Sequence, residues 1–281
     1  MTVAAPAKTA SASRHSSRGL TPSLSSRWVR WVLGAIGVLI VFGIWELLVV
    51  TGVLPEVDIP RASTVVGELA SQISQRSFWT ATALTARDAA VGLLIACLAG
   101  VPIGIAMGAF EPIRYALRPT VEFLRPVPGL AWVPLATVLW GPTKTSVVAL
   151  VIFGCIFPMI VQTIHGVQSA DPQMLMSARS FRLGMWARIR WIYFPGSLPH
   201  IVTGLRLCIA YALITSVGAS LIIGSPGIGT DIRLAQSSLE LPKMYSLVIA
   251  TGIIGLAGIA IAEIIDRLAL GWQRAGKTKA Q

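Results

Sequence analysis

Six apolar stretches, each close to the length that crosses a bilayer, constrain the fold of this chain more than any other feature. They fall at residues 28–51, 86–109, 128–142, 145–167, 200–223 and 244–267. A helix needs about 20 mainly apolar residues to span the hydrocarbon core. Because hydrophobic residues make up 54% of the chain and charged residues only 12%, we expect an all-α membrane protein with about six transmembrane helices.

The basic residues indicate how these spans are oriented. The formal net charge is +11, but Lys and Arg lie at the ends of apolar blocks, which argues for topology and against nucleic-acid binding. Fourteen of them fall in segments on the same side as the termini and five on the other side, which predicts cytoplasmic N- and C-termini. The fourteen are Lys8, Arg14, Arg18, Arg27, Arg114, Arg118, Arg125, Arg179, Arg182, Arg188, Arg190, Arg274, Lys277 and Lys279; the five are Arg61, Arg76, Lys144, Arg233 and Lys243.

Three regions are expected along the chain. Residues 1–26 are rich in Ala, Ser and Thr, contain no acid, and predict a disordered cytoplasmic tail. A secretory signal is disfavoured, because the apolar run that starts at Trp28 continues to Val50 without a clear cleavage site. Residues 27–270 form the transmembrane domain, and residues 271–281 form a basic cytoplasmic tail.

No residue constellation points to catalysis or to a metal. The cysteines Cys97, Cys155 and Cys208 lie inside apolar blocks without the spacing of metal ligands. The three histidines form no cluster, and no nucleophile and base pair up at membrane depth, which argues against an intramembrane hydrolase. We therefore expect neither a catalytic residue nor a metal in this chain.

Helix packing is predicted from small residues and from one amphipathic stretch. Gly100, Gly104 and Gly108 recur every four residues, and a second glycine stripe at 252, 255 and 258 lies in the last span; both favour close contact with another helix. Between the first two spans, residues 64–74 repeat apolar side chains every four positions. This stretch predicts a helix on the outer membrane face or, equally, a short packing element.

The third span is irregular. Pro126, Pro128 and Pro134 interrupt the entering helix, and Gly141 with Pro142 predicts a tight turn. Broken helices are tolerated at membrane depth only where protein or a water-filled cavity satisfies the backbone. The span therefore favours a translocation pathway, with a plain proline kink as the alternative.

A polar island from Ser169 to Pro199 separates the fourth and fifth spans. Apolar residues recur every four positions between four arginines, which predicts short amphipathic helices on the cytoplasmic side. We expect Gly184 to separate two helices, and Pro195 and Pro199 to end the second. The island either docks on a partner or rests on anionic lipid.

This island resembles the coupling loop of ABC importer permeases. The family pattern is Glu-Ala-Ala, three residues, Gly, nine residues, Ile-x-Leu-Pro, and it aligns without gaps when anchored on Pro195, with Ala178 and Ile192 matching. Other stretches resemble the branch that imports nitrate, sulfonates and taurine. These are WELLVVTGVLP from Trp45, IPRASTVVGEL from Ile59, RPVPGLAWVPLATVLW from Arg125 and FPMIVQTIHGVQSADP from Phe157, so the similarity covers roughly residues 40–270.

The loop also departs from the family pattern. Met176 replaces the glutamate, Ser177 the first alanine, Arg182 the glycine and Phe194 the leucine. A glycine two positions later, Gly184, suggests that the turn is shifted. In the fifth span, Ser220 stands where this branch commonly has an acidic residue.

The resemblance implies a homodimeric permease of the cell membrane, with ATPase subunits inside and a solute-binding protein outside. No Walker A sequence occurs, so ATP and Mg²⁺ are expected on the partner ATPase and no cofactor in this chain. The coupling residues would be Met176, Ser177, Ala178, Arg179, Phe181, Arg182, Gly184, Met185, Ile192 and Pro195.

The sequence does not identify the substrate. From span position alone, Trp132, Trp140, Ser216 and Ser220 are expected to line the pathway. A lining without carboxylates suits a small organic or inorganic anion of the sulfonate, taurine or nitrate type, and equally a neutral heterocycle or vitamin precursor. A non-transporting membrane scaffold whose basic loop recruits a partner is the remaining alternative.

Overall fold

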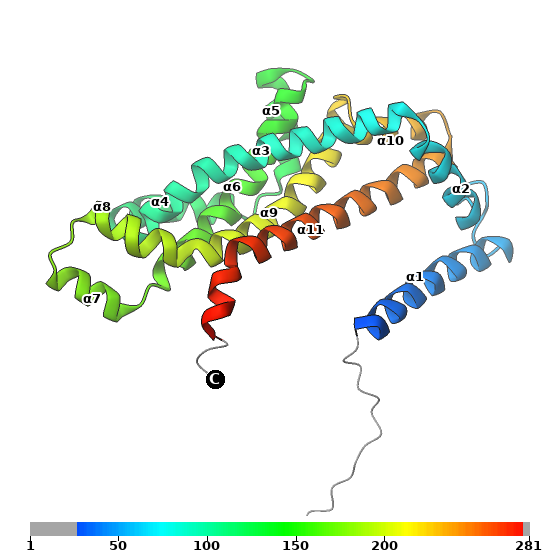
Figure 1. Ribbon diagram of the computed structural model, residues 1–281. Helices are drawn as coiled ribbons and strands as arrows, with labels where there is room; N and C mark the ends of the chain where they lie inside the picture. The colour runs from blue at the N-terminus through cyan, green and yellow to red at the C-terminus, as the bar shows by residue number, and fades with distance from the viewer. Residues whose placement is uncertain (1–26, 278–281) are drawn as a thin grey trace, which may run out of the picture.

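The computed structural model describes residues 27–277, and these contain helices and no strand (Figure 1). The elements are α1 (Arg27–Val50), α2 (Ala62–Ile73), α3 (Arg76–Ala109), α4 (Glu111–Leu124), η1 (Gly129–Trp132), α5 (Val133–Trp140), α6 (Lys144–Gln168), α7 (Pro172–Ser180), α8 (Met185–Arg188), the π turn η2 (Ile189–Tyr193), α9 (Phe194–Ile223), α10 (Ile228–Ser237) and α11 (Leu241–Lys277). The expected tail at 1–26 lies outside the described residues. Residues 271–277, expected to be tail, continue α11.

The predicted spans correspond to observed helices. Within the described residues, five helical segments are long and apolar enough to cross a membrane, and a bent pair supplies a sixth if counted as one span. The pair joins α4 to η1 and α5 at an angle of 88°, as a broken span or a re-entrant loop, so the irregularity predicted for the third span is confirmed. Two spans are longer than expected, because α3 begins at Arg76 and the fifth span begins at Met185.

Helices α3, α6 and α9 form the centre of the bundle. Buried Ala96, Cys155, Met159 and Cys208 belong to one apolar cluster at their contact. The thiols of Cys155 and Cys208 each donate to the backbone carbonyl of the other residue, at 3.4 and 3.3 Å. Paired thiol and carbonyl groups let α6 and α9 approach without leaving a polar atom unsatisfied in an apolar surrounding.

The glycine stripe of α3 is confirmed as a packing surface. A Cβ at Gly104 would lie 2.5 Å from Cβ of Thr163 and 2.8 Å from the carbonyl oxygen of Ile160, both on α6. At Gly108 it would lie 2.6 Å from Cβ of Val167. Small residues matter here because apolar side chains gain little by leaving lipid, so close backbone approach holds the helices together.

The second stripe is only partly used for packing. Gly258 faces Leu213 and Ile209 of α9, whereas a Cβ at Gly252 or Gly255 would meet nothing within 4 Å. The expectation of close packing along the whole stripe is therefore confirmed at one position of three. The open part of the stripe leaves an apolar face of α11 uncovered.

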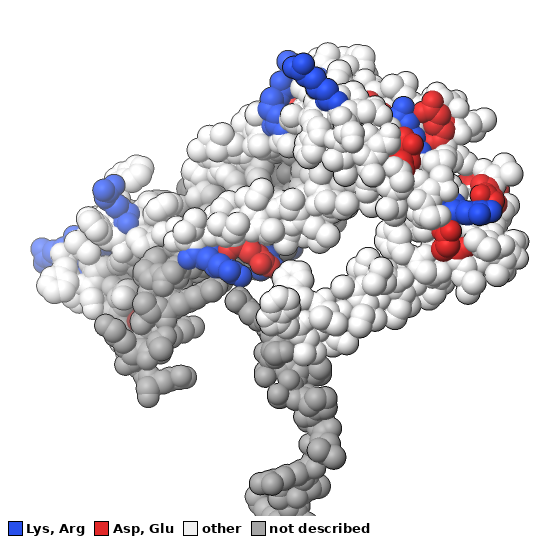
Figure 2. Space-filling model, turned by 45° about the vertical axis from the view of Figure 1, so that its right-hand side comes forward, with Lys and Arg blue, Asp and Glu red and all other residues white. Residues whose placement is uncertain are grey.

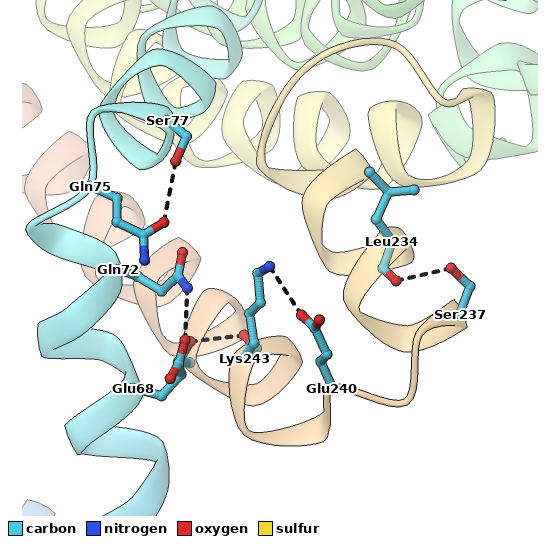
Figure 3. A network of polar contacts seen from close by, with 9 residues as sticks. Glu68, Gln72, Gln75, Ser77, Leu234, Ser237, Glu240 and Lys243 are labelled. Atoms are coloured by element: carbon cyan, nitrogen blue, oxygen red, sulfur yellow. Dashed lines mark hydrogen bonds and ion pairs between the residues drawn. The ribbon is translucent and has the colours of Figure 1, made fainter.

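Helices α2 and α10 both pack against α11 at one end of the molecule, where each helix has local polar contacts of its own (Figure 3). Nε2 of Gln72 donates to Glu68 at 2.7 Å, and Lys243 pairs with Glu240 at 3.0 Å. The amphipathic stretch predicted at 64–74 is α2, whose buried side chains include Val65 and Gln72. Because α2 packs against α11, the interpretation of a packing element is the one that the contacts support.

Helix α1 stands apart from the bundle (Figures 1 and 2). Most of its apolar side chains are exposed, and its links to the rest run through α2 and the aromatic contact between Trp45 and Tyr245. Figure 2 shows a broad uncharged surface with Lys, Arg, Asp and Glu gathered in a few small groups. Such a surface fits a bilayer, where charged side chains are costly.

We predict that Gly104→Ala destabilises the bundle by about 1–3 kcal/mol, because the added methyl group overlaps Thr163 and the α6 backbone. Gly67→Ala is the matched control, since a Cβ there meets nothing within 4 Å on an exposed face of α2. Thermal unfolding of both variants in detergent checks this, and equal melting temperatures would contradict it.

Candidate translocation and coupling site

A cavity of about 340 Å³ lies where the chain breaks between α4 and η1. Residues 125–129 form one wall, and α6 and α9 form the others. The break touches α6 here, since a Cβ at Gly129 would lie in ordinary van der Waals contact with Cα of Gly154, at 3.7 Å. The proline-rich break predicted from sequence therefore opens onto a cavity, as a pathway element requires.

The cavity wall combines aromatic rings with a few polar groups. Phe153, Phe157 and Tyr211 supply rings, and Gln162 and Thr215 supply neutral polar side chains. Arg125 is the one charged side chain among the lining residues, which include no carboxylate. The arrangement offers hydrogen-bond donors and one positive charge to a small solute.

The four pathway residues predicted from sequence do not line this cavity. The ring of Trp132 packs 4.9 Å from that of Phe153, so it stands behind the wall. Trp140 is partly exposed at the end of α5. Their part in transport stays a prediction.

The two serines are buried in helix contacts. Ser216 donates to the carbonyl of Thr85 on α3 at 3.1 Å, and Ser220 donates to Val217 at 3.0 Å. The carbonyl of Ser220 accepts from Thr230 of α10 at 3.0 Å. These bonds satisfy the serines within one copy of the chain and hold α9 against α3 and α10.

The loop predicted at Ser169 to Pro199 contains one short helix, α7, and the beginning of a long helical segment that starts at Met185, so two helices occur but only the first is short. Asp171 caps α7, its carboxylate accepting from the backbone N–H of Gln173 at 2.8 Å, and Pro172 occupies the first turn. Gly184 precedes α8, so the separating glycine is confirmed. Helix α7 projects from the end of the bundle (Figure 1).

The turn after α7 is not shifted to Gly184, contrary to expectation. Arg182 has φ +50°, whereas Gly184 has φ −62°. The N–H of Leu183 donates to the carbonyl of Ala178, and the N–H of Arg182 to that of Arg179, both at 2.9 Å. This is a Schellman motif with Arg182 at the left-handed position that usually takes glycine.

The expectation that Pro195 and Pro199 end the second helix is wrong. The helical chain runs from Met185 to Ile223 through both prolines. A π turn at 189–193 carries the chain to Pro195, with the N–H of Phe194 donating to the carbonyl of Ile189 five residues earlier, whereas Pro199 lies within α9 itself. The wider turn leaves room for the ring of Pro195, and such bulges commonly carry a helix past an interruption.

Large apolar and basic side chains are exposed around α7 and α8. Phe181 and Trp186 are 80% and 84% exposed. Met176, Ser177, Arg179 and Arg182 are also exposed, while Ala178 is buried beneath them. Met185, Ile192 and Pro195 are partly buried where the loop joins the bundle. The candidate coupling residues thus divide into an exposed tip and a supporting base.

No group of three or more His, Cys, Asp or Glu side chains that could hold a metal ion occurs in the part of the chain that the structure describes. Spanning helices around a break, a polar cavity at that break and a projecting loop together define a multi-pass membrane permease. The chain belongs to the family described as binding-protein-dependent transport system inner membrane component, which matches residues 100–270. It is thus an ABC importer permease of the cytoplasmic membrane.

Several characterised or named permeases are similar over most of the chain. The putative aliphatic sulfonates transport permease protein SsuC of Bacillus subtilis is 26% identical and covers 86% of this chain and 88% of its own length. The taurine transport system permease protein TauC of Escherichia coli is 31% identical, with coverage of 85% and 84%. The nitrate import permease protein NrtB of Leptolyngbya laminosa is 30% identical, with coverage of 69% and 70%.

Solved structures confirm the fold. The MetNI methionine ABC transporter in an inward-facing conformation matches with a TM-score of 0.61 at 13% identity, covering 69% of this chain and 96% of that one. An amino acid ABC transporter with histidines matches with a TM-score of 0.58 at 19% identity, covering 68% and 93%.

We predict that Arg182→Gly stabilises the isolated permease by about 1 kcal/mol, because glycine adopts positive φ without the clash that an L side chain meets. Gly184→Ala is the control, since its φ is negative and a Cβ there meets nothing within 4 Å. Thermal unfolding in detergent compares them. A lower melting temperature for Arg182→Gly would show that the side chain contributes more than the backbone strain costs.

Proposed function

We propose that this permease forms the translocation pathway for a small anion of the sulfonate, taurine or nitrate type. The observation that carries the proposal is the set of relatives named for these three substrates, which cover 69–86% of the chain. The cavity at the α4 and η1 break supports it, because Arg125 and neutral donors line the wall and no carboxylate does. A small anion needs this combination of charge and hydrogen bonds.

A neutral heterocycle or vitamin precursor is the second candidate. The rings of Phe153, Phe157 and Tyr211 around the same cavity favour it, since flat apolar solutes stack on aromatic side chains. The two candidates differ in their need for Arg125. A neutral solute gains little from a guanidinium, whereas an anion gains a charge-assisted contact.

Energy for transport would come from a separate ATPase that binds ATP and Mg²⁺. The loop of α7 and α8 is the proposed docking element, since it projects from the bundle and exposes Phe181 and Trp186 together with Arg179 and Arg182. Large aromatic and arginine side chains are typical of protein interfaces. Movement of two such loops by the ATPases would rock the helices between inward-open and outward-open states.

The expected orientation of the chain in the membrane assigns the remaining partners to its two ends. With both termini in the cytoplasm, α7 and α8 face the ATPase, and the opposite end with α2 and α10 faces a solute-binding protein outside. A second copy of the chain would complete the pathway. The exposed apolar side chains of α1 and the open glycines of α11 support a homodimer, because bare Gly252 and Gly255 admit a close helix contact.

The transport proposal predicts that the permease, reconstituted in proteoliposomes with its ATPase and binding protein, takes up at least one of labelled taurine, an aliphatic sulfonate and nitrate in an ATP-dependent manner. Uptake of neutral solutes alone would contradict the anion proposal. Failure to bind any ATPase would favour the scaffold alternative.

The coupling proposal predicts that acidic substitution of Arg179 and Arg182 together weakens assembly with the ATPase and lowers coupled ATP hydrolysis at least tenfold, because two exposed cations become anions. Arg76→Glu, an exposed arginine at the start of α3, is the control and should assemble normally. Copurification and ATPase assays measure both effects; unchanged assembly of the double variant would exclude a basic docking surface.

A further inference from the structure

A second cavity adjoins the first and shares two of its lining residues. It has a volume of about 310 Å³ and lies between α4 and the end of α6 that leads into α7. Arg125 and Val161 line both cavities. Arg125 therefore stands at the junction between the cavity at the helix break and the cavity beside the end of α6.

The second cavity carries an excess of positive charge. Arg114, Arg118 and Arg125 line it together with His165, and Glu122 is the one carboxylate among its lining residues. Three arginines against one glutamate leave a net positive field over the lining. A cleft of one charge sign raises the local concentration of oppositely charged solutes.

Two of these arginines already have partners. Arg114 donates through Nε to the carbonyl of Met107 at 2.8 Å and also to that of Gly108, so it caps the end of α3. Arg118 pairs with Glu122 at 2.7 Å on one face of α4. Their guanidinium groups serve the fold as well as the cavity.

Arg125 differs from both. None of the ion pairs or side-chain hydrogen bonds found among the described residues uses its guanidinium, which is exposed at the junction. Its backbone is fixed, because its N–H donates to Val121 at 3.0 Å and Pro126 follows. A planar group with five donors, held at a proline-rich break and lacking a partner, is suited to bind an anion with two hydrogen bonds.

We propose that Arg125 is the substrate-selecting residue of this permease, binding the anion in the first cavity and passing it to the second on the way to the cytoplasm. This inference rests on the anion import proposed above. Gln162, Tyr211 and Thr215 in the first cavity complete the hydrogen bonds that one guanidinium leaves unmade. In the second cavity, His165 and the two paired arginines lower the free-energy barrier for the anion to leave, and they bind it only weakly.

The test uses the complete transporter in proteoliposomes, with binding protein saturated by whichever of taurine, an aliphatic sulfonate or nitrate the wild type imports. We expect Arg125→Gln to lower the uptake rate tenfold or more, because a charged hydrogen-bond partner of the substrate is lost. Arg125→Lys should fall between the wild type and Arg125→Gln, because it keeps the positive charge but loses the planar group that makes two hydrogen bonds. Arg206→Gln is the matched control, an exposed arginine of α9 that pairs with Glu263 of α11 outside both cavities.

Moving the positive charge from Arg125 to another residue of the first cavity tests whether Arg125 selects the substrate or only supports the fold. In the double variant Arg125→Gln, Gln162→Arg, the positive charge returns on α6, and uptake should recover at least threefold over the single variant. A residue that only supported the fold would not be replaced in this way. Should Arg125→Gln fail to assemble, Gln162→Glu places a carboxylate in the same cavity and should also lower uptake.

The outcomes distinguish the two proposals. If the wild type imports an anion and Arg125→Gln or an assembled Gln162→Glu imports it as fast, the role of Arg125 is wrong while anion import stands. If Arg125→Gln behaves like Arg206→Gln, Arg125 is merely one of the cytoplasmic charges that orient the chain. If the wild type imports only neutral solutes, both proposals fall.

Discussion

The close contact of α3 with α6 through glycine is the interaction on which the other elements depend. In a bilayer, burying apolar side chains between helices brings little gain over contact with lipid, so association relies on tight packing. Gly92, Gly104 and Gly108 bring the two backbones together, and α9 then lies across both. Only with α6 and α9 fixed in this way does the break at residues 125–129 face a defined wall.

Much of the fold could be predicted because lipid imposes a simple rule on the backbone. Long apolar runs must be helical to satisfy their own polar groups, and the six runs correspond to the observed helices and the bent pair. The ends of the helices were harder to predict from the sequence than the helices themselves. Pro195 was expected to stop a helix, yet a π turn carries the chain past it, since the cost of a missing N–H depends on neighbours that sequence does not display.

The candidate site was harder to predict, for a physical reason visible in particular residues. Ser216 and Ser220 were predicted to line the pathway because of their position along the fifth span. Serine residues at such positions also hydrogen-bond to neighbouring helices, and here their contacts join α9 to α3 and α10. Arg125 was counted only as a charge that orients the chain. Its place between two cavities follows from the 88° bend, which no periodicity in the sequence reveals.

The continuous helical segment from Met185 to Ile223 has a thermodynamic consequence. At about 1.5 Å per residue, the exposed tip near Trp186 and the cavity residue Thr215 lie roughly 40 Å apart on one helical rod. If a partner's docking at the tip shifts the rod, the cavity changes shape, and the free energy of that coupling is the same in both directions. A solute in the cavity must then alter the partner's affinity for the tip by the same factor, so filling the cavity is itself a signal to the far end of the helix.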